Sequence, residues 1–232
     1  MPVQQKQNIK GFSLIELLVI IALISIIAGL SFPNFNKWQR DREVRVQAEK
    51  ITNLFTTATT QVERGAYPYV RIEFKLGTSP VQIIVKGITR DELSKKINSA
   101  TDPSCSDADF TKTASYVVDE ITSHTLNDKT YIPVLAPGNP SLGSGGAICF
   151  SKGGKYFKQH LSADKQGNIS FDNNTSPPTN NYVTVCHTNG TKCDAVTKAF
   201  EKEYPAYLVR YSRFGLITKY KWNIKKSDWS SQ

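Results

Sequence analysis

The longest apolar run of the chain extends from Leu17 to Phe32 and contains no charged residue. As a helix, residues 12–33 would cover about 33 Å at about 1.5 Å per residue, which matches the hydrocarbon core of a bilayer. One carboxylate, that of Glu16, lies at the start of this run. A charged group costs about 2.5 to 3.5 kcal/mol at the bilayer centre, so a chain that keeps one there indicates a function. The pattern predicts a membrane helix at 12–33 in which Glu16 has a partner.

Beyond Pro33 the apolar residues recur every three or four positions, which is typical of an amphipathic helix. They are Val44, Ala48, Ile51, Leu54, Phe55, Ala58 and Val62. Gly65 and Pro68 are poor continuations of a helix, so we expect the helix to stop near Gly65. The two patterns together predict one long helix, with an apolar half at 12–33 and an amphipathic half at 34–65.

The next segment has a period of two, which predicts a strand. Its apolar positions Val70, Ile72, Phe74 and Leu76 alternate with Tyr69, Arg71, Glu73 and Lys75. A Gly-Thr-Ser-Pro turn at 77–80 and a second strand at 81–86 complete a predicted hairpin. A short polar helix follows at 90–98, where Thr89 and Glu92 have the spacing of a capping box.

The rest of the chain predicts a β-rich domain at 66–232. Further strands are expected at 115–118, 131–135, 147–151, 169–171 and 182–186, and a short helix or extended loop at 194–203. Segments 137–146 and 172–181 are rich in Gly, Pro, Ser, Thr and Asn, so they are expected to be surface loops. The strands at 207–212 and 216–224 form a terminal hairpin around Gly215. The fold class is therefore α+β.

The terminal hairpin carries basic residues and no acid between Leu208 and Lys226. They are Arg210, Arg213, Lys219, Lys221, Lys225 and Lys226. A period of two puts Thr218, Tyr220, Trp222 and Ile224 on a core face and Lys219, Lys221 and Lys225 on the other. Two interpretations stay open. One is a solvated basic face, which we favour; the other is a DNA site with salt-dependent phosphate contacts, where Tyr211 or Phe214 stacks on bases.

No catalytic constellation stands out in the sequence. The histidines His124, His160 and His187 are scattered, and the chain lacks the GxxxxGK[ST] spacing that cradles phosphate. The net charge of +9 favours contact with anionic surfaces and says nothing about the fold. We therefore expect a protein that is not an enzyme and holds no cofactor and no metal.

The sequence Lys10-Gly11-Phe12-Ser13-Leu14-Ile15-Glu16-Leu17 resembles the class III signal of type IV pilins and secretion pseudopilins. The resemblance implies that a prepilin peptidase removes residues 1–11 as a leader by cutting after Gly11 and methylates Phe12. It makes Glu16 the acid that pairs with the terminal amine of a neighbouring subunit, and Pro33 a helix kink. A secretory signal has its cleavage site after a shorter apolar run, and a lipoprotein needs a cysteine at the cut. Neither pattern fits here.

The order of elements is similar to that of the GspH/FimT/FimU class of minor pilins and pseudopilins. The strand-Gly-strand ending at 207–220 is also similar to that class, whereas the long insertion between 88 and 147 departs from it. The resemblance implies a minor subunit of a type IV pilus, with two alternatives: a type II secretion pseudopilin, or a DNA-binding minor pilin for natural transformation. A membrane-anchored enzyme is a further alternative, but the sequence offers it no nucleophile or metal cluster.

The resemblance also sets the expected surroundings of the chain. A single-pass protein of the inner membrane, with its C-terminal domain in the periplasm, would then enter a pilus or pseudopilus. Its partners would be pilin-type subunits, the prepilin peptidase, the inner membrane and, on one interpretation, DNA. Lys6 and Lys10 leave with the leader, so a net charge of +9 becomes +7.

Four cysteines in a chain that leaves the cytoplasm predict two disulfides with three possible pairings. Cys186 and Cys193 flank an Asn-Gly turn dipeptide, so we favour one bond between them and a second between Cys105 and Cys149. The alternative is a metal site of Cys186, His187 and Cys193, but no second ligand motif supports it.

Overall fold

The computed structural model describes residues 12–76, 80–98, 105, 110, 118–132, 135–136, 146–154, 158–161, 181–187, 205–223, 225 and 228–232. Of these, the side chains of 30–34, 135–136, 158–161 and 228 are not described. The chain divides into two compact units, Met1–Gln39 and Arg40–Gln232, and each is described by itself.

One helix, α1 (Leu14–Arg64), accounts for 51 residues and confirms the predicted long helix. It stays helical through Pro33. At its end the Gly65 N–H donates to the carbonyl of Val62 at 3.1 Å, and Gly65 has a φ of +75°. A helix end of this kind favours glycine, because a side chain at positive φ meets the backbone. The predicted stop near Gly65 is confirmed.

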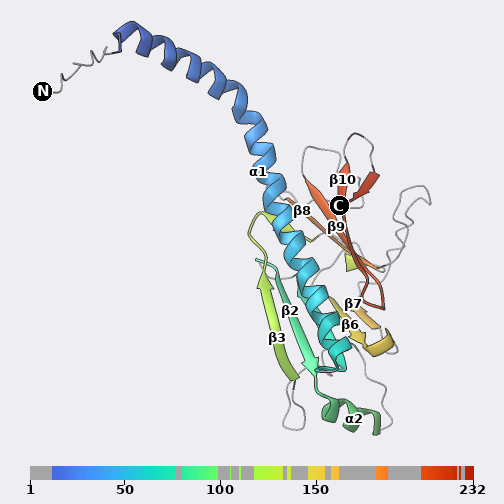
Figure 1. Cartoon of the computed structure of the whole chain (residues 1–232). Helices are drawn as coiled ribbons and strands as arrows, with labels where there is room; N and C mark the ends of the chain where they lie inside the picture. The colour runs from blue at the N-terminus through green and yellow to red at the C-terminus, as the bar shows by residue number, and fades with distance from the viewer. Residues whose placement is uncertain are drawn as a thin grey trace, which may run out of the picture. The chain divides into compact units, whose positions relative to one another are not determined.

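The first sheet has five antiparallel strands in the order β3-β2-β1-β6-β7 (Figure 1). Their bounds are β1 (Tyr69–Lys75), β2 (Gln82–Ile88), β3 (Val118–Thr125), β6 (Gly146–Ser151) and β7 (Lys158–Leu161). Strands β1 and β2 pair from Tyr69↔Ile88 to Lys75↔Gln82, which confirms the first predicted hairpin. The short helix α2 (Arg90–Asn98) follows β2 as predicted, and a single 3-10 turn (Lys152–Gly154) follows β6.

The second sheet is also antiparallel and contains the C-terminal hairpin. Its order is β11-β10-β9-β8-β4, and β5 also pairs with β8. The bounds are β4 (Thr130–Tyr131), β5 (Leu135–Ala136), β8 (Tyr182–His187), β9 (Ala206–Tyr211), β10 (Ile217–Asn223) and β11 (Asp228–Ser231). Strands β9 and β10 pair from Tyr211↔Ile217 to Tyr207↔Lys221, so the terminal hairpin around Gly215 is confirmed.

The amphipathic part of α1 joins both sheets in one hydrophobic core. Its predicted apolar stripe from Val44 to Val62 is buried together with side chains of β1, β2, β6, β8 and β9. Phe55 lies at the centre with no exposed surface, and its ring centroid is 4.8 Å from that of Tyr211 and 6.0 Å from that of Phe150. The predicted α+β architecture, a helix packed on antiparallel sheet, is therefore observed, with two sheets.

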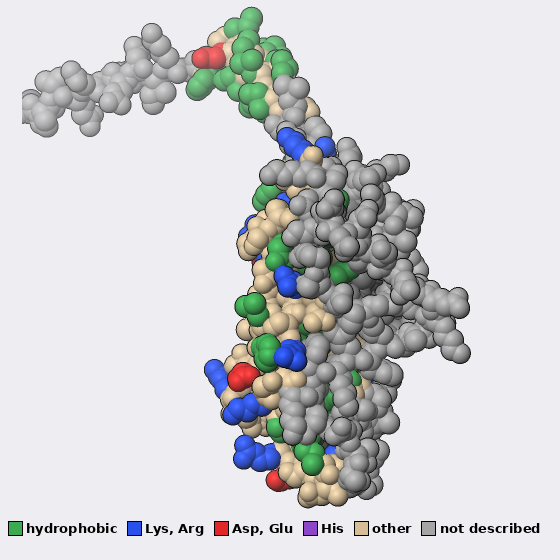
Figure 2. Space-filling model, turned by 90° about the vertical axis from the view of Figure 1, so that its right-hand side faces the viewer, with side chains coloured by type: hydrophobic (Ala, Val, Ile, Leu, Met, Phe, Trp, Pro, Cys, Tyr) green, Lys and Arg blue, Asp and Glu red, His purple; other side chains and the backbone are tan. Residues whose placement is uncertain are grey.

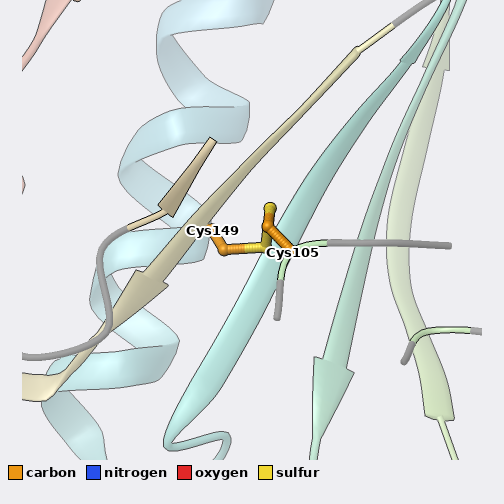
Figure 3. Close-up of a disulfide and its surroundings, with 2 residues drawn as sticks. All are labelled: Cys105 and Cys149. Carbon is orange, nitrogen blue, oxygen red and sulfur yellow. A yellow bond between two sulfur atoms is a disulfide. The ribbon is translucent and has the colours of Figure 1, made fainter. Parts of the chain in front are cut away.

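The outer face of the first sheet is covered as well. A second cluster of buried residues comprises Tyr69, Ile88, Leu93, Cys105, Phe110, Ala147 and Cys149. Cys105 and Cys149 form a disulfide across 44 residues of sequence, which confirms that predicted bond (Figure 3). Tyr69 and Arg71 are therefore buried, although the alternation in the sequence predicts them on an exposed face.

Several strand predictions are corrected. Residues 115–117 of the strand expected at 115–118 lie outside the described residues, and β3 extends from Val118 to Thr125. The strand expected at 131–135 is divided between β4 and β5. Strands β7 and β11 were not predicted. Strand β3 is an edge strand whose side chains are mostly half-buried, so its sequence needs few apolar residues. The elements expected at 169–171 and 194–203 lie outside the described residues.

Candidate functional site

The helix α1 begins two residues after Phe12. The Leu17 N–H donates to the Ser13 carbonyl at 3.2 Å, which closes the first turn, and the side chain of Phe12 is 77% exposed. Gly11 and the rest of the predicted leader lie outside the described residues. Phe12 therefore stands at the open start of a helix.

Glu16 lies in the first turn of α1, four residues after Phe12. Its side chain is exposed. The free N–H groups of a first turn give this end of the helix a partial positive charge, which favours a carboxylate there. The partial positive charge therefore favours an acid at this position. Because the Glu16 side chain is exposed, its carboxylate is accessible to a cation from another molecule.

Apolar side chains surround the helix after Glu16. We call residues 12–28 the assembly segment. Its large apolar side chains after Phe12 are 41% to 77% exposed: Leu14, Ile15, Leu17, Leu18, Val19, Ile20, Ile21, Leu23, Ile24, Ile26 and Ile27. Figure 2 shows this apolar surface over the first turns of the helix. A helix that is apolar on all sides is typical of one that is covered on all sides in its working state.

Residues 12–33 were expected to form a membrane helix. Within the part of the chain that the structure describes, no helix combines the length and the apolar character that crossing a membrane requires.

The lysines of β10 do not form the solvated face that the sequence predicts. Lys219 Nζ lies 3.0 Å from Glu49 Oε1, and Lys221 Nζ lies 2.8 Å from Asp41 Oδ1. Both acids belong to α1. The side chain of Lys219 is 17% exposed. The predicted solvated basic face is therefore wrong for these two lysines, which pair with the helix.

The register of the hairpin explains this reversal. Lys219 and Lys221 lie opposite Val209 and Tyr207, and both partners belong to the main core. Tyr220 instead lies opposite Leu208 and packs on the outer face of the sheet with Trp229. A lysine can occupy a position on the core side of the sheet, at the border of the core, because its long apolar stem packs there while its amine reaches a carboxylate.

The other basic residues of the hairpin are dispersed. Arg210 is half-buried, and Lys225 is exposed. Arg213 is exposed at the turn, with its guanidinium 4.5 Å from the centroid of the Phe214 ring. Lys226 lies outside the described residues. Tyr211 is 1% exposed, so its predicted role in stacking on bases is wrong, whereas Phe214 is 65% exposed.

A polar seam joins α1 to the second sheet. We define it as Asp41, Glu43 and Glu49 with their partners on the sheet side. The Tyr207 hydroxyl donates to Asp41 at 3.2 Å, and burial, followed by the charge of Asp41, raises the pKa of Tyr207. Hydrogen bonds from Arg45 and Lys219 lower the pKa of Glu49. Asp41 and Glu49 therefore each accept a hydrogen bond from the second sheet.

Glu43 faces a histidine at the end of β8. His187 Nε2 lies 3.6 Å from Glu43 Oε2, and Lys129 Nζ lies 3.8 Å from Glu43 Oε1. Burial is the largest influence on His187 and lowers its pKa, while Glu43 raises it and Arg40 and Lys129 lower it. The folded domain therefore favours the neutral form of His187.

Of the two cysteines predicted to pair at the end of β8, the structure describes Cys186. Cys186 is buried and disulfide-bonded, so it is not a thiolate ligand for a metal. Cys193 lies outside the described residues, and the Cys186–Cys193 bond stays a prediction. Among the described residues, no group of three or more His, Cys, Asp or Glu side chains is placed to hold a metal ion.

Comparison with known proteins addresses the N-terminal segment. Residues 6–32 match the family described as the prokaryotic N-terminal methylation motif. The chain carries a prepilin-type N-terminal methylation motif. It is also 42% identical over 52 residues to a protein named "Type IV major pilin protein PilA" from Myxococcus xanthus (strain DK1622). That match covers 22% of this chain and 22% of the relative. No solved structure matches the chain.

The prepilin-type motif includes every residue of the predicted processing site. Gly11, Phe12 and Glu16 all fall within the matched range, and Pro33 directly follows it. The resemblance to type IV pilins is thereby confirmed for the N-terminal part, where the chain is type IV pilin-like. The roles of these four residues are not tested by the match and stay predictions.

Asp41 and Glu49 were not predicted as partners of the hairpin lysines. A signal was present, because these acids lie eight residues apart, a little over two helical turns, beside the apolar positions Val44 and Ala48. Acids beside a buried apolar stripe of a helix can pair with basic residues at the border of the sheet that packs on the stripe.

Proposed function

We propose that the chain is a non-enzymatic structural subunit, a minor pilin, of a type IV pilus-type filament. The observation that carries the proposal is the prepilin-type motif at the start of a helix whose apolar side chains are exposed on all sides. Such a surface is stable when neighbouring helices or lipid cover it. The pilin named among its relatives supports the same class of assembly.

Processing converts the chain into the assembling form. The prepilin peptidase cuts between Gly11 and Phe12, removes the leader at 1–11 and methylates the new amine. Residues 12–33 are the membrane and assembly half of the helix, 34–65 the amphipathic half, and 66–232 the globular domain. Before assembly the chain is held in the inner membrane with the domain in the periplasm, and Pro33 kinks the helix.

In the filament, the apolar helix halves pack together and Glu16 pairs with the Phe12 amine of a neighbour. An ion pair in apolar surroundings aligns subunits because an unpaired charge there is strongly unfavourable. The Glu16 carboxylate is exposed in the single chain, which suits a partner on another molecule.

A minor rather than a major subunit is supported by the terminal hairpin, whose predicted strands β9 and β10 are present. The relative from Myxococcus xanthus is itself named a major pilin, but the match covers 22% of each chain. A minor pseudopilin of a type II secretion system is the second candidate, because the same motif and helix serve both filaments.

A glutamine variant of Glu16 tests the assembly role. We expect the Glu16→Gln chain to be cleaved normally but to be absent from sheared filaments. The matched control is Glu63→Gln, an exposed acid at the other end of α1, which should enter filaments like the parent. Normal incorporation of the Glu16→Gln chain would contradict the proposed pairing.

A further inference from the structure

Two aromatic rings lie together on α1 beyond the assembly segment. Phe35 and Trp38 have ring centroids 5.7 Å apart at an interplanar angle of 36°. Their side chains are 56% and 54% exposed, and Lys37 beside them is exposed. All three residues belong to the unit Met1–Gln39. An exposed aromatic pair next to an amine is therefore a feature of the helix itself.

The position of this pair along the helix matches the thickness of a bilayer. Trp38 follows Glu16 by 22 residues, which is about 33 Å at about 1.5 Å per residue. The hydrocarbon core is about 30 Å thick, so a helix with Glu16 near one boundary has Trp38 near the other. The charge-free run from Leu17 to Phe32 lies between them.

The side-chain types fit that boundary. Tryptophan is enriched at the level of the lipid headgroups, where its ring is in apolar contact and its N–H reaches polar partners. A lysine near the membrane boundary extends its amine toward the phosphates. Phe35 and Trp38 are three residues apart, so they project from one side of the helix. The arrangement suits a lipid interface better than a pocket in a protein.

We propose that Phe35 and Trp38 form an aromatic anchor that holds this part of α1 at the headgroup boundary of the membrane before assembly. The partner is the phospholipid interface, with Lys37 contacting lipid phosphates. The inference rests on the proposed storage of the subunit in the membrane and adds the residues that fix its depth.

Depth-dependent fluorescence quenching tests the anchor. The full chain is reconstituted in phosphatidylcholine–phosphatidylglycerol vesicles that carry a quencher near the headgroup, at mid-chain or at the acyl terminus. The chain has three tryptophans. A Trp222→Phe/Trp229→Phe variant leaves Trp38 as the probe. We expect the strongest quenching from the shallow label, at a depth of about 15 Å from the bilayer centre.

The tryptophan pair of the second sheet packs at 5.2 Å, so its replacement can unfold the domain. The same experiment is therefore repeated on the parent chain and on Trp38→Phe, and the difference between them isolates Trp38. Both routes should give the same shallow depth.

A second probe separates failure of the anchor from failure of membrane storage. Ile27 lies midway between Glu16 and Trp38, eleven residues from each, so Ile27→Trp in a chain without the other tryptophans should be quenched most by the terminal label. If this probe is deep while Trp38 is unquenched or equally deep, the anchor is overturned and storage stands. If neither probe is quenched, both are overturned.

The anchoring by the two rings has its own test. In a chain with Phe35→Ala and Trp38→Ala, the Ile27→Trp probe should move away from the bilayer centre or spread over several depths. A depth identical to that in the chain with both rings would overturn the anchor. Phe214→Ala, which removes an exposed ring outside the assembly segment, is the matched control and should leave the probe depth unchanged.

Discussion

Replacing Phe55 by alanine should weaken the domain more than any other single truncation in α1. Phe55 has no exposed surface and contacts rings from both sheets: Tyr211 of β9 at 4.8 Å, Phe150 of β6 at 6.0 Å and Phe74 of β1 at 6.3 Å. The cavity and the lost transfer free energy together cost about 3 to 5 kcal/mol for a buried Phe→Ala change. Because domains of this kind are stable by about 5 to 15 kcal/mol, this is a large share.

Urea unfolding of the full chain in detergent micelles measures the effect. The fluorescence of Trp222 and Trp229 reports the second sheet, and hydrogen exchange of β1 and β6 amides reports the first. Both sheets should lose stability together, because Phe55 packs on both. The matched control is Phe214→Ala, a change of the same chemistry at a side chain that is 65% exposed, which should stay within about 0.5 kcal/mol of the parent.

Two results would refute this reasoning. A loss below about 1 kcal/mol in Phe55→Ala would mean that the site collapses fully or that the ring is not central to the core. A loss confined to one sheet would mean that the helix does not couple the two.

Three further predictions concern the same domain. Burial lowers the pKa of His187 below its ordinary value of 6.5, so the neutral form stabilises the fold above that pH. The free energy of unfolding should therefore fall as the pH drops below about 6.5. His187→Gln should flatten this dependence in urea titrations between pH 5 and 8, and an unchanged slope would contradict the prediction. Cys105→Ser/Cys149→Ser should cost about 4 kcal/mol for a loop of 44 residues, measured by thermal unfolding, with an unaltered melting temperature as the contrary result. Gly215→Ala should cost about 1 to 3 kcal/mol because Gly215 has a φ of +81° and an added Cβ would lie 3.0 Å from Thr59. The control is Gly153→Ala, at a φ of +64° in open space, which measures the backbone strain without a close contact. Equal losses of stability in the two variants would exclude the contact with Thr59 as a cause.

The sequence predicts the helix and its core face well because the determining pattern is local. The stripe from Val44 to Val62 needs one periodicity and one partner surface, and every residue of it is buried. The two hairpins could be predicted equally well, because in each a turn signal joins two adjacent strands. Gly65 was predicted to end the helix and Gly215 to lie in the turn of the terminal hairpin, and both have the positive φ that such positions favour.

The orientation of β10 was not predictable from its own alternation. Tyr220 and Trp222 are the larger apolar residues, and a period of two assigns them to the main core. The structure instead turns Lys219 and Lys221 toward the helix, because Glu49 and Asp41 supply carboxylates there. Ion pairs between residues at least 170 positions apart leave no local trace in either segment.

Most of the edge strand β3 was missed for a related reason. Strand β3 pairs with β2 along its length, yet its side chains are half-buried or exposed, so it carries little apolar signal. The motif at the N-terminus behaves in the opposite way. The motif is readable in the sequence. In the proposed function its residues are recognised by processing and assembly partners, and in the single chain Phe12 and Glu16 are exposed.

The mass and N-terminal sequence of the mature chain test the central claim most directly. The full chain is produced with and without a prepilin peptidase, and a Gly11→Leu variant serves as the control. A pilin-type subunit should yield a product that begins at methylated Phe12 when the peptidase is present, and the Gly11→Leu chain should remain whole. A chain left whole beside an active peptidase, or cut at another position, would contradict the account.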